Sequence, residues 1–124
     1  MSTSGGNLPA RYVIHTVGPV WQGCKKNEPQ ILESCYCHSM EEAHRLRCSS
    51  ISFPSISTGA FGYPVEDAAG IAVRTVVEHL HAQRSLVLAR FVLFDPATFS
   101  AYARAAQELE SAFPYIHVKT EAIP

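Results

Sequence analysis

The chain has 124 residues, of which 47% are hydrophobic and 17% charged, so it holds enough apolar material for the core of one domain. Its formal net charge of −1 gives no bulk attraction to nucleic acid or to an anionic membrane surface. No apolar run approaches the roughly 20 residues of a membrane span, and the first residues, MSTSGGNLPAR, lack the apolar segment of a signal peptide. We therefore expect a single cytoplasmic domain over residues 1–124, with no membrane or strong nucleic-acid binding.

Three segments have the composition of buried strands. Residues 12–17, YVIHTV, are β-branched and aromatic and stop at a Gly-Pro pair. Residues 50–56, SISFPSI, follow the same pattern, although Pro54 indicates an irregular ladder or a bulge. Residues 86–94, LVLARFVLF, are almost continuously apolar. These patterns predict strands near residues 11–17, 50–57 and 86–94.

Helical periodicity lies between and after these strands. Apolar residues recur at spacings of three and four, which predicts helices near residues 28–47, 65–82 and 96–112. Asn27 is placed to cap the first helix, and Asp95 with the following proline is placed to cap the last. Alternation of strands and helices predicts an α/β fold of the three-layer α/β/α type, with a mostly parallel sheet.

The cysteines and histidines show no familiar metal-site spacing. The four cysteines are Cys24, Cys35, Cys37 and Cys48. Cys35 and Cys37 point in different directions on a helix, and adding His38 and His44 does not complete a zinc pattern. His79, near a helix end, is expected at the surface. We expect free thiols, no metal and no cofactor.

The loop STGAFGYP, residues 57–64, is the richest candidate site because it joins a strand to a helix. Its two glycines, Gly59 and Gly62, allow positive φ and close backbone approach, and successive amides in such a loop can bind an anion. Ser57 and Thr58 add hydroxyls, the following helix adds its positive dipole end, and the loop's two aromatic residues can shield a ligand or press on a sugar. The loop suits a phosphate or diphosphate, although it equally suits a tight strand-to-helix connection.

Three segments of the sequence resemble the macrodomain family: NLPARYVIHTVGP at 7–19, SISFPSISTGAFGYPVEDAAGIAVRTV at 50–76 and FVLFD at 91–95. The likeness is to the branch that reverses ADP-ribosylation and deacetylates O-acetyl-ADP-ribose. It implies that the loop wraps the diphosphate and distal ribose of ADP-ribose, and that the end of the third strand lies near the adenosine. The ligand-binding residues so implied are Ser57, Thr58, Gly59, Ala60, Phe61, Gly62, Tyr63, Phe94 and Asp95.

The sequence departs from the family pattern at its N-terminal side. Family members carry, ahead of the first matching segment, a central strand that ends in an Asn-Ala-Ala-Asn motif, a glycine-rich first loop and an acidic group for adenine. None of these occurs here, so the chain resembles the C-terminal two-thirds of a macrodomain and the catalytic residues are unknown. Because positioning supplies about 7 to 11 kcal/mol of a barrier in favourable cases, we expect ADP-ribose binding with weak or no catalysis. The alternatives are a hydrolase of ADP-ribosyl groups or O-acetyl-ADP-ribose, and a reduced domain that binds nothing and acts by oligomerisation.

The resemblance also implies a gap between the strands at 12–17 and 50–56, where the central strand lies in the family. Either these two strands pair directly, or the YIHVK segment at 115–119 enters the sheet, or a second copy of the chain covers the open edges. We expect a homodimer, with ADP-ribose or an ADP-ribosylated protein as the other partner.

Overall fold

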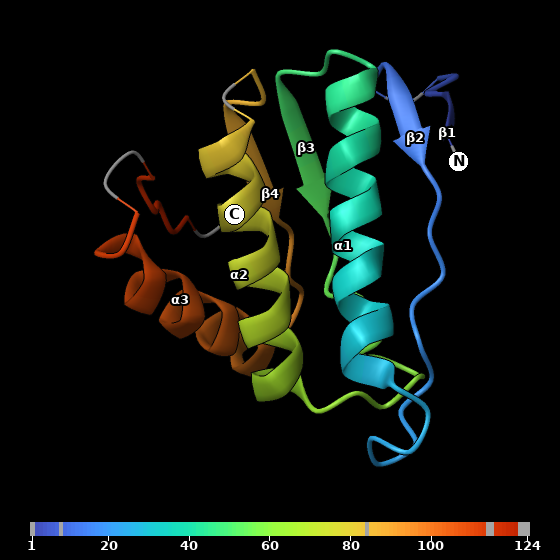
Figure 1. Cartoon of the computed structure of the whole chain (residues 1–124), viewed down its shortest axis with the longest axis vertical. Helices are drawn as coiled ribbons and strands as arrows, with labels where there is room; N and C mark the ends of the chain where they lie inside the picture. Colours follow the sequence, from blue (N-terminus) through green and yellow to red (C-terminus); the bar gives the residue numbers. More distant parts are fainter. Residues whose placement is uncertain (1, 8, 84, 114–115, 122–124) are drawn as a thin grey trace.

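The computed structural model of the chain describes residues 2–7, 9–83, 85–113 and 116–121. In these residues strands and helices alternate as the sequence predicts, after one additional strand at the start (Figure 1). The elements are β1 (Ser2–Ser4), β2 (Tyr12–Ile14), α1 (Glu28–Arg45), β3 (Ser50–Phe53), α2 (Val65–Ala82), β4 (Leu88–Phe91) and α3 (Pro96–Glu110). The predicted α/β fold is confirmed, and the helix bounds agree with the predicted ones to within about two residues.

The strands form two small sheets. β3 and β4 are parallel, with Ser50 opposite Leu88 and Phe53 opposite Phe91. β2 pairs instead with β1 in antiparallel orientation, a pairing that the sequence did not predict. β3 ends at Phe53, four residues before its predicted end, because Pro54 has no amide hydrogen to donate to a ladder.

The first alternative for the gap, direct pairing of β2 with β3, is wrong because the two strands belong to different sheets. Within a single chain, the described residues of the YIHVK segment do not fill the gap either. Tyr115 lies outside the described residues, and residues 116–119 form no strand. Val118 instead donates its amide to the Glu110 carboxylate at 2.7 Å. Within the described part of the chain, β2 and β3 therefore each keep one open edge.

One face of the β3–β4 pair carries the core. Phe53 and Phe91 point toward the helices, with ring centroids 5.7 Å apart. Tyr36 of α1 lies 5.1 Å from Phe53, and Tyr102 of α3 lies 5.1 Å from Phe91, again between ring centroids. Aromatic pairs of this kind each add about 0.5–1.5 kcal/mol beyond the burial of area. The cluster ties α1 and α3 to the same face of the strands, and α2 packs between the two helices (Figure 1).

The helix starts confirm one cap and correct the other. Asp95 caps α3 as predicted, since its Oδ1 accepts from the Thr98 amide at 2.9 Å. Asn27 occupies the cap position of α1 in a left-handed conformation, with φ of 58°, and makes no side-chain cap hydrogen bond. The buried carboxylate of Glu28, the first residue of α1, accepts amides of the preceding loop, so the loop is tied to this helix start by a residue that the sequence pattern did not single out.

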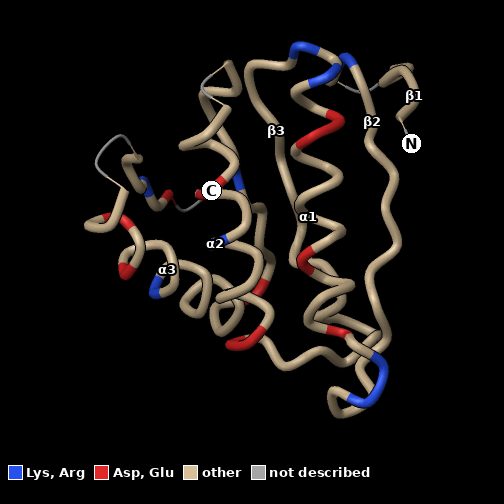
Figure 2. Tube along the Cα trace, in the orientation of Figure 1, with Lys and Arg blue, Asp and Glu red and all other residues tan. Residues whose placement is uncertain are grey.

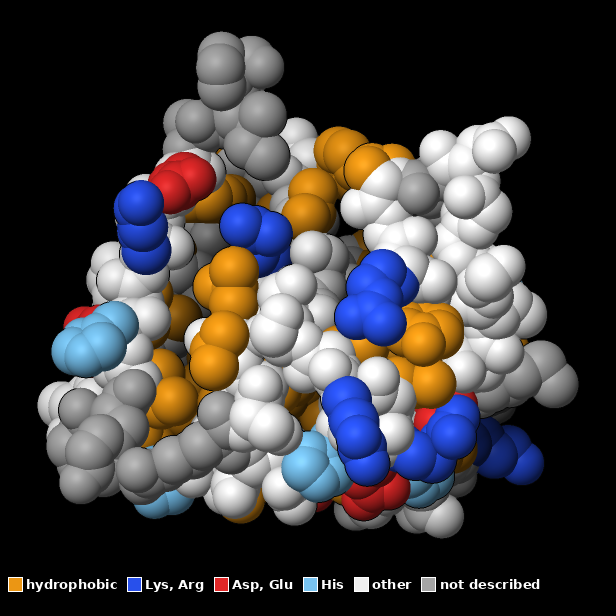
Figure 3. Space-filling model, turned by 90° about the horizontal axis from the view of Figure 1, so that it is seen from above, with side chains coloured by type: hydrophobic (Ala, Val, Ile, Leu, Met, Phe, Trp, Pro, Cys, Tyr) orange, Lys and Arg blue, Asp and Glu red, His pale blue; other side chains and the backbone are white. Residues whose placement is uncertain are grey.

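Charges of both signs are scattered over the elements, while the segment between β3 and α2 has none (Figure 2). The end of the molecule at the top of Figure 1, seen from above in Figure 3, carries Lys, Arg and His side chains together with exposed apolar ones. None of the described helices is both long and apolar enough to cross a membrane.

Candidate ligand-binding site

The carboxyl ends of β2, β3 and β4 point to the same end of the molecule, at the bottom of Figure 1. There the loop after β3 and the segment after β4 enclose a hollow of about 270 Å³. Two segments that lie some 35 residues apart in the sequence, and that were predicted separately, thus meet in one place. The hollow is lined by Pro54, Ser55, Thr58, Gly59, Val92, Leu93, Phe94, Asp95 and Thr98.

A chain of hydroxyl groups anchors the start of the loop to the core. The Tyr36 and Tyr102 hydroxyl oxygens are 3.5 Å apart, and Tyr102 lies 2.8 Å from the Ser55 hydroxyl. Ser55 in turn lies 2.6 Å from the Thr58 hydroxyl. The Ile56 amide donates to the Tyr36 hydroxyl at 3.2 Å. Burial, followed by the neighbouring Tyr102, raises the pKa of Tyr36 well above its ordinary value, so the network consists of neutral hydroxyls.

The rest of the loop closes on itself through backbone hydrogen bonds. The Gly62 amide donates to the Gly59 carbonyl at 3.0 Å, and the Tyr63 amide to the Ser57 carbonyl at 2.9 Å. The left-handed residues are Ser57, with φ of 68°, and Gly62, with φ of 74°. The expectation of a positive φ at Gly59 is therefore wrong, although a Cβ there meets no protein atom within 4 Å.

The turn leaves a run of amides without acceptors. Among the described residues, the amides of Thr58, Gly59, Ala60 and Phe61 make no hydrogen bond. The loop is exposed from Gly59 to Gly62. Successive free amides in a turn are the usual protein ligand for phosphate oxygens. This is the arrangement that the glycine pattern predicted, and it needs no lysine or arginine.

The positive dipole end of α2 follows the loop but is partly neutralised. Glu66 and Asp67 occupy the first turn of this helix. Glu66 forms an ion pair with Arg104 of α3. The free amides, rather than the helix dipole, are thus the feature of this loop best suited to an anion.

The aromatic residues of the site divide into exposed and buried ones. Phe61 is 40% exposed and Phe94 is 94% exposed, so both can cover a ligand. Tyr63 is only 2% exposed, and its ring packs against Trp21 with centroids 4.7 Å apart. Burial raises the pKa of Tyr63. Tyr63 therefore supports the loop from beneath. The sequence had suggested that its ring contacts the ligand, and this expectation is wrong.

Asp95 lies at the rim of the hollow with both carboxylate oxygens in use. The Thr98 amide donates to Oδ1 at 2.9 Å and the Thr98 hydroxyl to Oδ2 at 2.8 Å. These bonds to the Thr98 amide and hydroxyl hold the pKa of Asp95 below its ordinary value. Asp95 is an ionised cap and not a free proton acceptor.

Ser57 and Gly18 pack closely where the loop passes the end of β2. The Ser57 hydroxyl is buried and has no hydrogen-bond partner among the described residues. A Cβ added to Gly18 would lie 2.2 Å from this hydroxyl oxygen and 2.4 Å from an Ile56 methyl carbon. Any larger residue at position 18 requires the side chains of Ser57 and Ile56 to shift, a packing constraint that the sequence did not reveal.

Another support missed at the sequence level is the loop between β2 and α1. Amides of Gln22, Cys24 and Lys26 donate to the buried Glu28 carboxylate at 2.7, 3.0 and 2.6 Å. Burial alone would raise the pKa of Glu28, but these amides outweigh it and hold the pKa below its usual range. The Trp21 amide next to this loop donates to the Phe61 carbonyl at 2.8 Å, which links it to the candidate site.

The family model and the similar proteins indicate the same family. Residues 1–72 match the family model of the Macro domain. The chain is 47% identical over 108 residues to a macro domain-containing protein of Caldanaerobacter subterraneus subsp. tengcongensis, covering 87% of this chain and 61% of that protein. It is 49% identical over 102 residues to an O-acetyl-ADP-ribose deacetylase of Klebsiella pneumoniae, covering 82% of this chain and 58% of the relative.

The fold agrees with the same family. The structure superposes on an Oceanobacillus iheyensis macrodomain solved with ADP, with a TM-score of 0.82 and 40% identity, over 90% of this chain and 58% of the other. This chain therefore belongs to the macro domain family. It spans about three-fifths of the length of the relatives that it matches.

Proposed function

We propose that this chain binds ADP-ribose, or the ADP-ribosyl group of a modified protein, at the loop of residues 57–63. The observation that carries the proposal is the run of four acceptor-free amides from Thr58 to Phe61. In our proposal the diphosphate accepts hydrogen bonds from these amides, and Phe61 lies over the adjoining ribose. The hollow between Thr58 and Phe94 takes the adenosine side.

The relatives support this assignment of ligand. One similar structure is named with bound ADP, and one similar protein is named for its action on O-acetyl-ADP-ribose. Both ligands contain the adenosine diphosphate unit that a run of backbone amides and an apolar hollow suit.

For the same segment we infer binding with weak or no catalysis. Residues 57–62 carry no ionisable side chain, and both oxygens of Asp95 are engaged by Thr98. The site so described lacks a group placed to activate water. The deacetylase relative favours the second candidate, hydrolysis of O-acetyl-ADP-ribose or of a protein-linked ADP-ribosyl group. Release of acetate or ADP-ribose above the uncatalysed rate, with purified protein, would decide for the hydrolase.

The test of binding is calorimetric titration of ADP-ribose into the protein and into Gly59→Val. A Cβ added at this position meets no protein atom within 4 Å, and the valine side chain projects into the space that the proposal gives to the ligand. We expect binding to be lost in this variant. The matched control is Gly70→Val on α2, where an added Cβ also meets nothing within 4 Å. Unchanged affinity in Gly59→Val contradicts the placement, and absence of binding by the unmutated chain at millimolar ADP-ribose contradicts the function.

We also propose that the chain forms a homodimer. Three large apolar side chains are strongly exposed, namely Phe94 at 94%, Val17 at 81% and Val87 at 74%. β2 and β3 each keep an open edge in the described part of the chain. A two-fold pair of chains can bury exposed apolar side chains and open strand edges on both copies. Light scattering at micromolar concentration tests this, and dimerisation without ADP-ribose binding would favour the alternative of a domain that acts by oligomerisation alone.

A further inference from the structure

Three side chains with metal-binding atoms meet between α1 and α2. Cys37 and Glu41 lie one turn apart on α1, and His79 faces them from α2. The Cys37 sulfur is 3.3 Å from Oε1 of Glu41 and 3.4 Å from Nε2 of His79. All three ligand atoms lie within 4.8 Å of one another. The sequence spacing gave no sign of this cluster, because its third member comes from a different helix.

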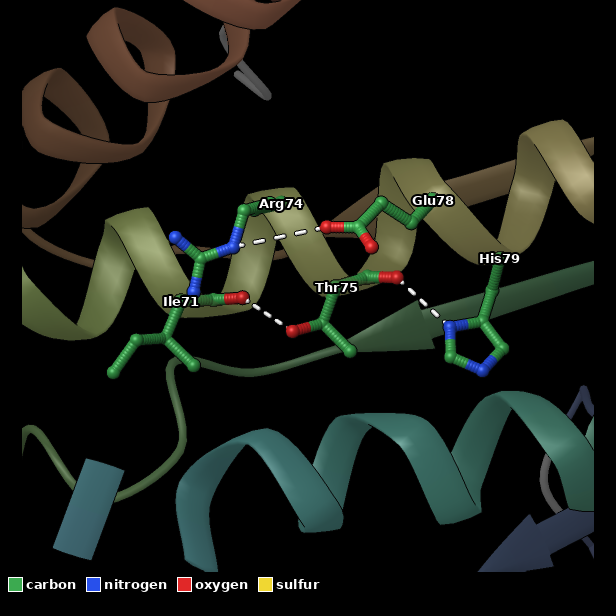
Figure 4. A network of polar contacts seen from close by, with 5 residues as sticks. All are labelled: Ile71, Arg74, Thr75, Glu78 and His79. Atoms are coloured by element: carbon green, nitrogen blue, oxygen red, sulfur yellow. Dashed lines mark hydrogen bonds and ion pairs between the residues drawn. The ribbon is translucent and has the colours of Figure 1, made fainter. Parts of the chain in front are cut away.

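The hydrogen bond made by Nδ1 of His79 determines which ring nitrogen can bind a metal. Nδ1 of His79 lies 2.9 Å from the Thr75 carbonyl oxygen, as Figure 4 shows. A carbonyl only accepts, so Nδ1 carries the hydrogen, and in the neutral ring Nε2 has a free lone pair directed at Cys37. A backbone carbonyl on the second nitrogen is the usual outer partner of a metal-bound histidine.

The three ligand atoms share too few hydrogen atoms to form a hydrogen bond at both close contacts. With a neutral imidazole, the sulfur, the carboxylate oxygen and Nε2 are three lone-pair centres that share one thiol hydrogen. The thiol can donate that hydrogen to either Glu41 or His79, so the other of the two sulfur contacts has no hydrogen bond. Burial, then the hydrogen bond and charge of Glu41, raises the pKa of the Cys37 thiol when no cation is present. A cation at the centre would satisfy all three atoms at once.

The spacing suits zinc. Tetrahedral zinc with bonds of about 2.3 Å to sulfur and about 2.0–2.1 Å to nitrogen or oxygen places sulfur about 3.5 Å from each neighbouring ligand atom. The observed separations of 3.3 and 3.4 Å are close to this value. A thiolate, a carboxylate and a neutral imidazole together carry the charge of −2 that balances Zn²⁺. His79 also lies in the last turn of α2, where the negative end of the helix dipole favours a cation.

The cluster is open to solvent and separate from the ligand site. Glu41 is exposed and borders an open hollow shared with His38, Glu42 and Arg45. His79 comes 14 residues after Val65, the first residue of α2, so it lies about 21 Å along the helix from the loop that precedes it. A metal can therefore enter without disturbing the ADP-ribose site.

We propose that Cys37, Glu41 and His79 form a binding site for a thiophilic divalent cation, with Zn²⁺ as the ion that fits best. Water takes the fourth position, and the bound ion links α1 to α2. On binding, the thiol proton is released to solvent and the sulfur–metal bond replaces the sulfur–hydrogen bond.

The test uses the reduced full chain after treatment with a chelator. Zn²⁺ is titrated by calorimetry, and Co²⁺ is titrated with detection of the absorption spectrum. We expect one ion per chain, together with a sulfur-to-cobalt charge-transfer band and the visible bands of tetrahedral cobalt. Cys37→Ser and His79→Gln should each weaken binding at least tenfold. The matched controls are Cys24→Ser, an exposed thiol elsewhere, and His44→Gln, an exposed histidine of α1, and both should bind as the unmutated chain does.

A measurement on the unmutated chain guards against variants that fail to fold. Alkylation is followed for each cysteine by mass spectrometry of peptides, with and without Zn²⁺. We expect Zn²⁺ to protect Cys37 and leave Cys24 reactive. The proposal is overturned if no stoichiometric binding is seen, if the cobalt complex lacks the sulfur band, or if Cys37 and Cys24 are protected equally.

Discussion

Tyr36→Phe is the substitution that most sharply probes how the core holds the ligand loop. It removes only the hydroxyl oxygen and leaves the ring between Phe53 and Phe91, at centroid distances of 5.1 and 6.1 Å. The hydroxyl accepts the Ile56 amide at 3.2 Å and lies 3.5 Å from Tyr102. The variant thus separates the hydroxyl network from the packing of the aromatic cluster.

The expected cost follows from what the hydroxyl leaves behind. The Ile56 amide loses its acceptor in a partly buried place, which costs about 1–3 kcal/mol. In a domain of this size, 1 kcal/mol lowers Tm by about 3–6 °C. Because Ile56 precedes the loop directly, we also expect weaker ADP-ribose binding, since the loop must be ordered again before it can hold the diphosphate.

The assay is urea denaturation monitored by circular dichroism, with Tyr12→Phe as the matched control. Tyr12 is half-buried in β2, and within the described residues its hydroxyl makes no hydrogen bond, so its loss should cost less than about 0.5 kcal/mol. If Tyr36→Phe is no less stable than Tyr12→Phe, the hydroxyl network does not support the loop and the reasoning is refuted.

Three further substitutions test other parts of the account. Glu28→Gln removes the carboxylate that accepts three loop amides. Because the folded pKa of Glu28 lies below the ordinary value of about 4.3, this stabilisation is present above that pH and is lost as the pH falls through the folded pKa. As the pH is lowered below about 4.3, the unmutated chain should therefore lose more stability than the variant in denaturation curves. Leu32→Ala empties a fully buried position and should cost about 2–5 kcal/mol, whereas Ile31→Ala, at the exposed neighbour, should cost far less; equal losses would contradict the assigned core face of α1. Phe94→Ser should shift light scattering from dimer toward monomer, and an unchanged mass would remove Phe94 from the proposed interface.

The order of the main elements and the bounds of the helices were predictable because they depend on local patterns, whereas all three predicted strands are shorter in the structure. The 3.6-residue periodicity of α2 and the Asp-Pro start of α3 act within a few residues, and both are confirmed. β1 was not predictable, because Ser2–Ser4 has no strand pattern of its own and is ordered only through pairing with β2. Tertiary partners decide such short strands.

The candidate site was predictable only in part, for the same reason. Glycines in a strand-to-helix loop predict a turn with free amides, but they do not identify the residue that takes the left-handed conformation. In the structure Ser57 takes it and Gly59 does not. Nor did the sequence show that Tyr63 points into the core. The hydroxyl network through Tyr102 and the contact of Cys37 with His79 join residues more than 40 positions apart, and no local spacing encodes such contacts.

The central claim, that the free amides of the loop hold a diphosphate, is tested most directly by titrating ADP-ribose into ¹⁵N-labelled protein and following each backbone amide by NMR. The account predicts saturable shifts at Thr58, Gly59, Ala60 and Phe61, larger than those of the Gly62 amide, which is already bonded within the loop. Adenosine without phosphates should leave these four amides nearly unmoved. Saturable binding of ADP-ribose that leaves the four amides unshifted would contradict the account.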